Sequence, residues 1–280
     1  MVSISGKSLD QNIEMLKRIL ANPGRIAAVE LNLACPNVIG KPIIAYDFDQ
    51  MKLVLDKVSR LPGITKIPLG IKLPPYFDGP HFEQAAKILN AYKSVVKYVC
   101  CINTIGNALA IDPVSEAPVI ASKGGLAGLS GRAVKYTALA NVRQMRSFLD
   151  ESIDVVGAGG VESGTDAFEL ILCGAKAVQV GTCHWKEGPQ CFDRICAELR
   201  ELMEDKCYQN VDEFCNKLKP WSKEGAAASR AAKKKDSMIS GDVGAVAKKD
   251  KADDTYMLLS GILVVLLAVL LADKLGAIEL

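Results

Sequence analysis

The stretch that decides the fold reads ELNLACPNVIGKP, residues 30–42. An apolar run predicts a buried strand up to Leu33, and the prolines and glycine after it indicate a shaped loop. α/β barrels carry their chemistry in loops at the carboxyl ends of their strands. Cys35 lies in this loop between Asn32 and Asn37, whose carboxamides suit a planar ligand with carbonyl and N–H edges. Cysteine is often just a small buried residue, but these neighbours favour a functional loop.

The composition limits the classes of function. The chain has 280 residues, 49% of them hydrophobic, which suffices for one large domain and an appendage. A net charge of +2, without a long basic stripe in the first 220 residues, argues against a nucleic-acid binder. Nine cysteines show no CxxC spacing and no signal peptide precedes them, so we expect neither disulfides nor zinc. His81 and His184 belong to no ligand motif, which disfavours a metal site or a histidine triad.

Strand-like runs alternate with helical periodicity through the first two thirds of the chain. Strands are predicted at residues 2–5, 27–31, 68–72, 98–102, 154–157 and 177–181. Helices are predicted near residues 9–21, 48–60, 81–93, 134–149, 164–173 and 189–205, with a further short helix at about 211–217. This alternation predicts a parallel sheet with crossover helices.

Polar residues follow two of these predicted strands. Lys72 ends an apolar run, and a cation leaving a buried strand needs an electron-rich partner such as a carboxylate or a ring carbonyl. A lysine that extends to solvent at the barrel rim is the plainer alternative. Asn103 and Thr104 offer an amide and a hydroxyl at an equivalent height, although both residue types are common in turns.

Glycine loops follow the last two predicted strands. The sequence has Gly-Ala-Gly-Gly at 157–160 and Gly-Thr at 181–182, and each loop leads toward a predicted helix. Glycine lets backbone N–H groups approach an anion, and barrel enzymes commonly bind phosphate after strands 7 and 8. The spacing differs from the dinucleotide-binding fingerprint, and each loop taken singly is consistent with a tight turn. The glycine-rich stretch 124–131 offers a further anion-facing turn.

The motifs together closely resemble the class 1 dihydroorotate dehydrogenases, particularly the fumarate-linked 1A group. The matching segments are NLACPNVIGKP (32–42), YDF (46–48), KLPPYFD (72–78), NTIGN (103–107), TALAN (137–141), the glycine pair at 159–160, DAF (166–168) and GT (181–182). The resemblance covers residues 1–219, and a cysteine at position 35 separates class 1 from the membrane-linked class 2 enzymes, which use serine there.

The resemblance implies an FMN-containing (β/α)₈ TIM barrel that oxidises (S)-dihydroorotate to orotate in pyrimidine biosynthesis. It implies that Cys35 removes the C5 proton while the C6 hydride goes to flavin N5, with fumarate as the electron acceptor and a homodimer as the assembly. The implied substrate ligands are Asn32, Asn37, Asn103 and Thr104. The implied cofactor ligands are Asn32, Lys72, Ile102, Gly131, Gly159, Gly160, Gly181 and Thr182.

The sequence departs from this family pattern in two respects. Six strand–helix units are predicted rather than eight, so we expect the first two barrel strands to be absent and two sheet edges to be unpaired. Residues 220–255 predict a flexible basic linker, and residues 256–272 form an uncharged run that predicts a transmembrane helix. We therefore expect a tail-anchored membrane protein with its catalytic domain facing the cytosol. A buried or partner-binding helix is the alternative for this run.

Two other functions stay open at the level of sequence. The chain could be a catalytically inactive, tail-anchored scaffold built on a truncated barrel. It could also be a related flavin enzyme acting on another reduced pyrimidine, such as dihydrouracil, because the Cys35 loop alone does not exclude that substrate.

Overall fold

The computed structural model describes residues 1–34 and 43–239. The chain divides into two compact units, Met1–Leu218 and Lys219–Leu280. The first unit contains the sheet and its covering helices. The described part of the second unit contains the helix α8 (Lys223–Ile239). This helix was not predicted, because the sequence indicated a flexible linker over residues 220–255. Its alanine- and lysine-rich sequence has a high helix propensity.

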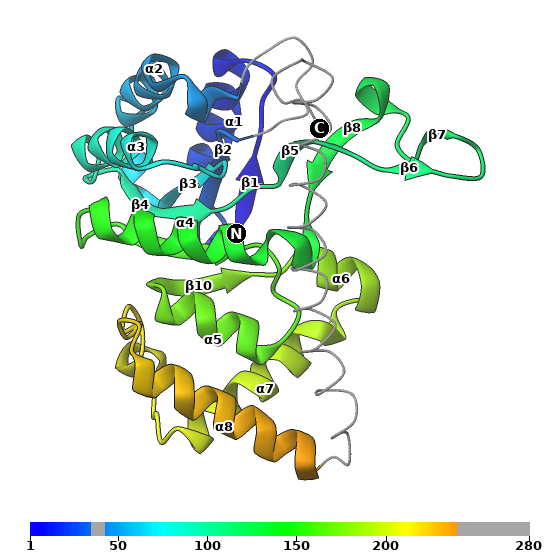
Figure 1. Ribbon diagram of the computed structural model, residues 1–280. Coiled ribbons are helices and arrows are strands. Elements are labelled where there is room, and N and C mark those ends of the chain that lie inside the picture. The colour runs from blue at the N-terminus through cyan, green and yellow to red at the C-terminus, as the bar shows by residue number, and fades with distance from the viewer. Residues whose placement is uncertain (35–42, 240–280) are drawn as a thin grey trace, which may run out of the picture. The chain divides into compact units, whose positions relative to one another are not determined.

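Six parallel strands form the main sheet, in the order β1-β2-β3-β4-β9-β10 (Figure 1). Their bounds are β1 (Val2–Ile4), β2 (Val29–Asn32), β3 (Leu69–Leu73), β4 (Val96–Cys101), β9 (Asp154–Ala158) and β10 (Ala175–Gln179). All six predicted strands are confirmed, and so is their parallel arrangement. Within the described residues β1 and β10 are the edge strands, and no ladder joins them.

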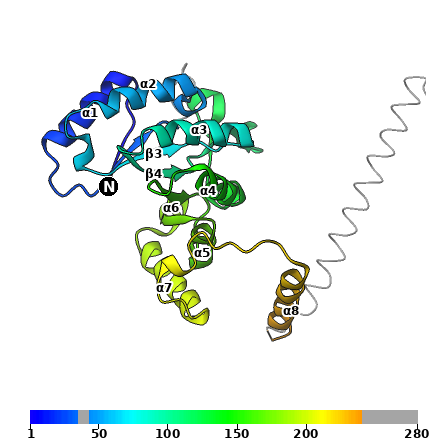
Figure 2. The same ribbon diagram turned by 90° about the vertical axis from the view of Figure 1, so that its left-hand side faces the viewer.

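Helices follow the strands and lie next to one another (Figure 2). They are α1 (Leu9–Ala21), α2 (Phe48–Ser59), α3 (Gly79–Ala91), α4 (Lys135–Phe148), α5 (Gly164–Leu172), α6 (Thr182–Glu187) and α7 (Gln190–Asp205). Capping side chains explain why several of them begin where they do, because each accepts a hydrogen bond from an N–H group of the first turn. These caps are Ser8, Asp47, Asp78 and Ser163.

Three parts of the chain differ from the sequence-based expectation. The helix α6 was not predicted, because six residues are too few to show a helical period. The helix predicted at 211–217 is wrong, since only a single 3₁₀ turn forms at Val211–Glu213. An antiparallel excursion separates β4 from α4, and it comprises β5 (Ile105–Leu109), β6 (Ile111–Asp112), β7 (Ala117–Pro118) and β8 (Leu126–Leu129). Figure 1 shows this excursion projecting away from the main sheet.

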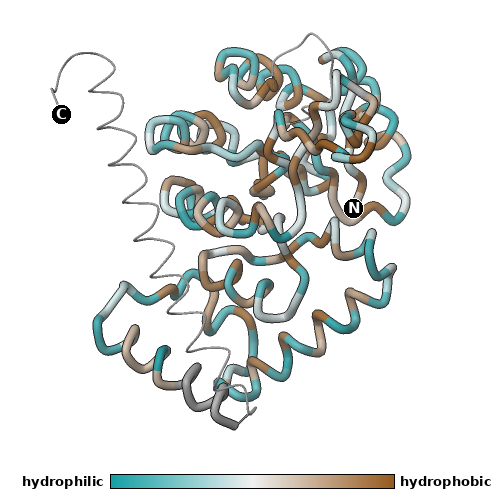
Figure 3. Tube along the Cα trace, turned by 45° about the vertical axis from the view of Figure 1, so that its right-hand side comes forward, coloured by the Kyte–Doolittle hydropathy of each residue, from teal (hydrophilic) through white to brown (hydrophobic). Residues whose placement is uncertain are grey.

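The core lies between the sheet and its helices. Leu31, Leu69, Ile71, Val99 and Val155 lie on neighbouring strands and are fully buried. Along the covering helices hydrophobic and hydrophilic residues alternate (Figure 3), which is the pattern of a helix with one buried face. The apolar strands therefore form a rigid base from which polar residues emerge at the carboxyl ends.

No helix within residues 1–34 and 43–239 is long and apolar enough to span a lipid bilayer. The run 256–272, on which the prediction of a transmembrane helix rests, lies outside these described residues.

Candidate functional site

A cleft lies at the carboxyl ends of β3, β4, β9 and β10. It brings together nine of the residues predicted as ligands, from segments far apart in the sequence: Lys72, Ile102, Asn103, Thr104, Gly131, Gly159, Gly160, Gly181 and Thr182. Apolar side chains line part of its wall, among them Val134, Ala158, Val161 and Val180. The cleft thus combines polar groups, glycine backbone and an apolar surface.

Lys72 is held in the cleft by partners from two other strands. Its Nζ donates to Gln179 Oε1 at 2.8 Å and contacts Cys100 Sγ at 3.0 Å. The amide nitrogen of Gln179 in turn donates to Glu30 Oε2 at 2.8 Å, and Glu30 is only 3% exposed. A buried carboxylate needs a hydrogen-bonded or charged partner, and here one glutamine connects it to the lysine. This chain of contacts fixes the position of the ammonium group.

Asn32 and Asn103 lie together beside Lys72. Asn103 Nδ2 donates to Asn32 Oδ1 at 3.1 Å, and the same oxygen accepts the N–H of Ala34 at 3.0 Å. Asn103 Oδ1 accepts the backbone N–H of Thr104 at 2.8 Å. Asn32 at the end of β2 and Asn103 after β4, both predicted substrate ligands, therefore share one hydrogen-bond network.

Hydrogen bonds connect the residues on both sides of the segment 35–42 to each other and to the chain after β3. Ala45 N donates to Leu33 O at 3.1 Å, which brings the chain after the segment back to its beginning. The hydroxyl of Tyr46 donates to Pro75 O, and that of Tyr76 donates to Ala45 O. Cys35 and Asn37 themselves, predicted as base and substrate ligand, lie outside the described residues.

Glycines shape the loop after β9, residues 159–163, which we call the β9 loop. Gly159 and Gly160 have φ angles of +127° and +72°, which other residues rarely adopt. A Cβ on Gly159 would lie 2.9 Å from Ala138 Cβ, and one on Gly160 would lie 2.6 Å from Lys135 Cβ. Only glycine lets this backbone lie so closely against α4 while it lines the cleft.

The loop after β10, residues 180–182, which we call the β10 loop, meets the end of the antiparallel excursion. Thr182 Oγ1 donates to Ser130 Oγ at 3.0 Å. Gly131 has a φ angle of +74°, and a Cβ on it would lie 3.2 Å from Thr182 Cγ2. The glycine at 131 thus permits the close approach of two segments that both line the cleft.

An ion pair supports the β9 loop. Lys135 Nζ lies 2.5 Å from Asp166 Oδ1 and 2.7 Å from Glu169 Oε2. The other oxygen of Asp166 accepts the backbone N–H of Glu162 at 2.9 Å and the hydroxyl of Ser163 at 2.9 Å. Burial alone would raise the pKa of Asp166, but these hydrogen bonds lower it below its ordinary value. The carboxylate therefore joins α4, α5 and the β9 loop.

The thiols in or near the cleft are poor bases. Burial raises the pKa of Cys100 to about 12, and it raises that of Cys101 further. Burial and the neighbouring Glu187 carboxylate raise the pKa of Cys183 to about 11. These groups stay protonated near neutral pH, so they cannot accept a carbon-bound proton there.

Several residues in or next to the cleft were not predicted from the sequence. Gln179 could have been noticed as a polar residue within the apolar strand β10, and Glu30 as a charge within β2. Ser130 lies beside the predicted Gly131, and Glu162 closes the β9 loop. Their functional context depends on strands distant in sequence, which a local pattern does not show.

Residues 1–203 match the family described as "Dihydroorotate dehydrogenase". The chain is 49% identical over 216 residues to a dihydroorotate dehydrogenase (fumarate) from Saccharomyces bayanus, covering 77% of this chain and 67% of that protein. It is 49% identical over 217 residues to dihydroorotate dehydrogenase A (fumarate) from Lactococcus lactis subsp. cremoris, covering 78% of this chain and 68% of that protein. The chain therefore spans about two thirds of the length of these relatives.

Solved structures share the fold at lower sequence identity. A ligand-free DHODH structure from Eimeria tenella aligns with a TM-score of 0.57 and 22% identity, covering 73% of this chain and 60% of that chain. The Eimeria tenella DHODH in complex with ferulenol aligns with a TM-score of 0.55 and 21% identity, covering 76% of this chain and 58% of that chain. The architecture is accordingly α/β and barrel-like, with six parallel strands in the main sheet of the described residues. On the family match and the identity to its members, the chain belongs to the dihydroorotate dehydrogenase family.

Proposed function

We propose that this chain oxidises (S)-dihydroorotate to orotate with FMN as its cofactor, as a step of pyrimidine biosynthesis. The observation that carries the proposal is the cleft, in which the β9 and β10 loops, Lys72 and Asn103 lie together. Family membership and the fumarate-linked names of relatives that are 49% identical support the same reaction.

The residues of the cleft fit FMN. The glycine backbone of the β9 and β10 loops provides N–H groups for a phosphate, and Gly131 leaves room where these loops approach the end of β8. The apolar wall suits a planar ring system. Lys72 is the cation that would face the electron-rich end of that ring, and Ile102 would contact the ring from the end of β4.

The protein's own groups have separate roles in this reaction. When bound, FMN supplies the hydride acceptor. Asn32, Asn103 and Thr104 would bind the carboxylate and ring amides of the substrate, together with Asn37. Cys35 would accept the C5 proton, provided that its thiol titrates near neutral pH. The buried thiols of Cys100 and Cys101 are unsuited to that role, because their pKa values lie far above neutrality.

An absorption spectrum of the purified full chain tests this function. We expect about one FMN per chain, and we expect its visible absorbance to fall when dihydroorotate is added without oxygen. Cys35→Ala should keep the flavin but slow this reduction by about 100-fold or more, the usual effect of losing a general base. Cys196→Ala, on an exposed cysteine of α7, is the matched control and should leave the rate unchanged.

Other outcomes of the same experiment would contradict the proposal. A colourless protein would favour the inactive scaffold. Flavin that dihydrouracil reduces, but dihydroorotate does not, would favour the related dihydropyrimidine oxidoreductase. Fumarate as electron acceptor and the homodimer stay predictions, which reoxidation of the reduced protein by fumarate and light scattering would test.

We also propose that residues 256–272 anchor the chain in a membrane, with residues 1–219 in the cytosol. The run is uncharged over 17 residues and rich in leucine and valine. The full chain should stay with the membrane fraction after alkaline carbonate extraction. Leu266→Arg should release it, because a charge at the centre of a span costs about 3 kcal/mol. Asp253→Arg, outside the run, should not, and extraction of the unmodified chain would refute the anchor.

A further inference from the structure

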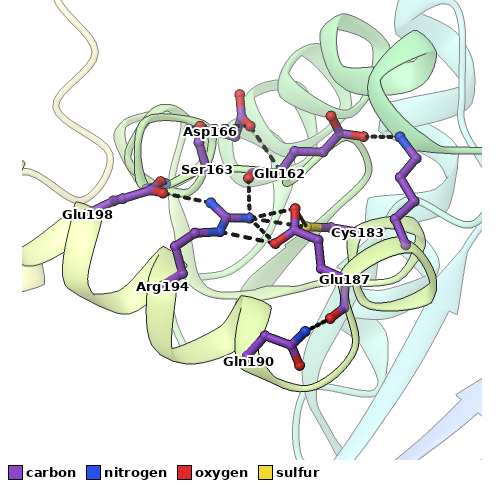
Figure 4. Close-up of polar contacts among 10 residues, drawn as sticks. Glu162, Ser163, Asp166, Cys183, Glu187, Gln190, Arg194 and Glu198 are labelled. Carbon is purple, nitrogen blue, oxygen red and sulfur yellow. Dashed lines mark hydrogen bonds and ion pairs between the residues drawn. The ribbon is translucent and has the colours of Figure 1, made fainter.

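Arg194 on α7 uses its whole guanidinium in polar contacts (Figure 4). Its Nη1 donates to Glu198 Oε1 at 2.6 Å, and its Nη2 donates to Glu187 Oε2 at 2.7 Å. Its Nε also donates to Glu187 Oε2, at 3.1 Å. A guanidinium holds such partners in a fixed planar arrangement, which the single ammonium of a lysine cannot reproduce.

One set of these contacts fixes the β9 loop. Arg194 Nη2 donates to the backbone oxygen of Glu162 at 3.1 Å, at the end of the loop that contains Gly159 and Gly160. The second oxygen of Glu198 accepts the backbone N–H of Gly164 at 2.7 Å. Arg194 and its partner Glu198 therefore hold the backbone on both sides of Ser163.

The other set fixes the region that directly follows the β10 loop. Glu187 ends α6, and its Oε1 accepts from the thiol of Cys183 at 3.4 Å. Arg194 Nη2 also contacts Cys183 Sγ at 3.5 Å. Cys183 is 1% exposed and follows Gly181 and Thr182 directly in the chain. The same guanidinium thus contacts segments adjoining both glycine loops.

These ion pairs are too exposed to be important mainly for stability. The side chains of Arg194, Glu187 and Glu198 are 38%, 41% and 36% exposed. Ion pairs that solvent reaches contribute little to the free energy of unfolding. Their number and direction instead restrict where the two loops lie relative to each other. Hydrogen bonds from Gly164 N–H and Arg194 lower the pKa of Glu198, and those from Arg194 and Cys183 lower that of Glu187, so both stay ionised.

We propose that Arg194 is a positioning residue that sets the separation of the β9 and β10 loops, so that their backbone N–H groups converge on the phosphate of FMN. This proposal rests on the proposed function. Arg194 is expected to affect only the phosphate end of the cofactor. Within the described residues it has no contact with Lys72 or Asn103.

Comparing FMN with riboflavin tests the inference, because riboflavin has the same ring but no phosphate. In equilibrium dialysis of the full chain, Arg194→Met should weaken FMN binding by about tenfold or more, the equivalent of losing one charge-assisted hydrogen bond to the phosphate. Riboflavin binding should change less than about twofold, which is under 0.5 kcal/mol. Arg194→Lys should give an intermediate loss of FMN binding, since lysine keeps the positive charge but lacks the planar set of guanidinium N–H donors.

The control is Arg143→Lys, because Arg143 donates to Asn216 Oδ1 at 2.7 Å and does not line the cleft. It should leave the binding of both flavins unchanged. Equal losses of FMN and riboflavin binding in Arg194→Met would show a merely structural role, and no loss of either would also overturn the inference. An unmodified chain that binds neither flavin would instead refute the proposed function, and the inference with it.

Discussion

Asp166 is the buried carboxylate on which the arrangement of the β9 loop depends. It is 3% exposed, and its partner Lys135 is 8% exposed. The desolvation of two charges is costly, so such a pair need not stabilise the fold more than two apolar residues would. Removing one partner is different, because it leaves the other charge buried without adequate compensation.

Replacing Asp166 with asparagine should therefore lower the free energy of unfolding by about 2–4 kcal/mol. Glu169, at 2.7 Å from Lys135 Nζ and 37% exposed, will compensate the lysine only in part. Urea unfolding at neutral pH measures the loss. Asp212→Asn, on an exposed pair with Lys176, is the matched control and should change little.

The same carboxylate predicts a dependence on pH. The pKa of Asp166 is lower in the folded chain than its ordinary value of 3.8, so the ionised form stabilises the fold above that value. This contribution is lost as the pH falls through the ordinary value toward the folded one. The stability difference between the unmodified chain and Asp166→Asn should narrow from about pH 5 to about pH 3. A difference that stays constant over this range would contradict the assignment.

At the scale of elements, the antiparallel excursion contributes to the cleft through its last strand. Gly128 lies on β8, and a Cβ there would be 2.1 Å from Thr104 Oγ1 and 2.6 Å from Thr104 Cβ. Ser130 and Gly131, which follow β8, line the cleft directly. The strand thus sets the position of Thr104, a proposed substrate ligand, without itself carrying a reactive group.

Gly128→Ala should displace Thr104 and raise the KM for dihydroorotate by about tenfold, the equivalent of one lost hydrogen bond. Steady-state kinetics measure the change, and an FMN content equal to that of the unmodified chain shows that the cleft is intact. Gly79→Ala is the control, because a Cβ at the start of α3 meets no atom within 4 Å. An unchanged KM in Gly128→Ala would show that Thr104 can move without consequence.

The elements that sequence predicted are those with a strong local signal. The apolar runs of β2, β3 and β4 were found because most of their residues are buried on both faces of the sheet, and α1 begins where Ser8 caps it. The excursion was missed because its strands are short and several of its apolar residues are exposed, for example Ile111 at 62% and Val114 at 91%. Exposed apolar residues do not follow the regular spacing that burial against a core imposes, so the sequence of the excursion shows no strand pattern.

The site follows the same division. Gly159 and Gly160 were predicted because a glycine pair directly after a predicted strand indicates, from the local sequence alone, a loop whose backbone can bind an anion. Glu30 and Gln179 lie 149 residues apart in sequence and meet only through the sheet. In the sequence Arg194 is likewise one charged residue on an amphipathic helix. Its role follows only from the packing of α7 beside the β9 loop. Residues of this kind acquire their roles from tertiary proximity, which one sequence does not display.

At the scale of the whole molecule, the sheet has two parts that are connected differently. The ladders β1-β2, β2-β3 and β3-β4 join strands that follow one another with a single α-helix between them. The ladder β4-β9 joins residues 98–101 to residues 154–157, across the excursion and α4. The cleft lies over this last junction, with Lys72 and Asn103 on one side and the β9 and β10 loops on the other.

This topology has a consequence for the order of folding. The partners in the β4–β9 ladder lie 56 residues apart in sequence (Tyr98 and Asp154), against 27 in β1–β2 and 40 in β2–β3, so this pairing closes the longest of these loops and is the slowest to form. The segment β1 to β4 can therefore acquire structure before β9 and β10 are in place. Because its two sides belong to different parts of the sheet, the cleft is complete only after the slow pairing. During refolding the ability to retain the cofactor should thus appear after most of the helical signal, and flavin capture reports that the two parts have joined.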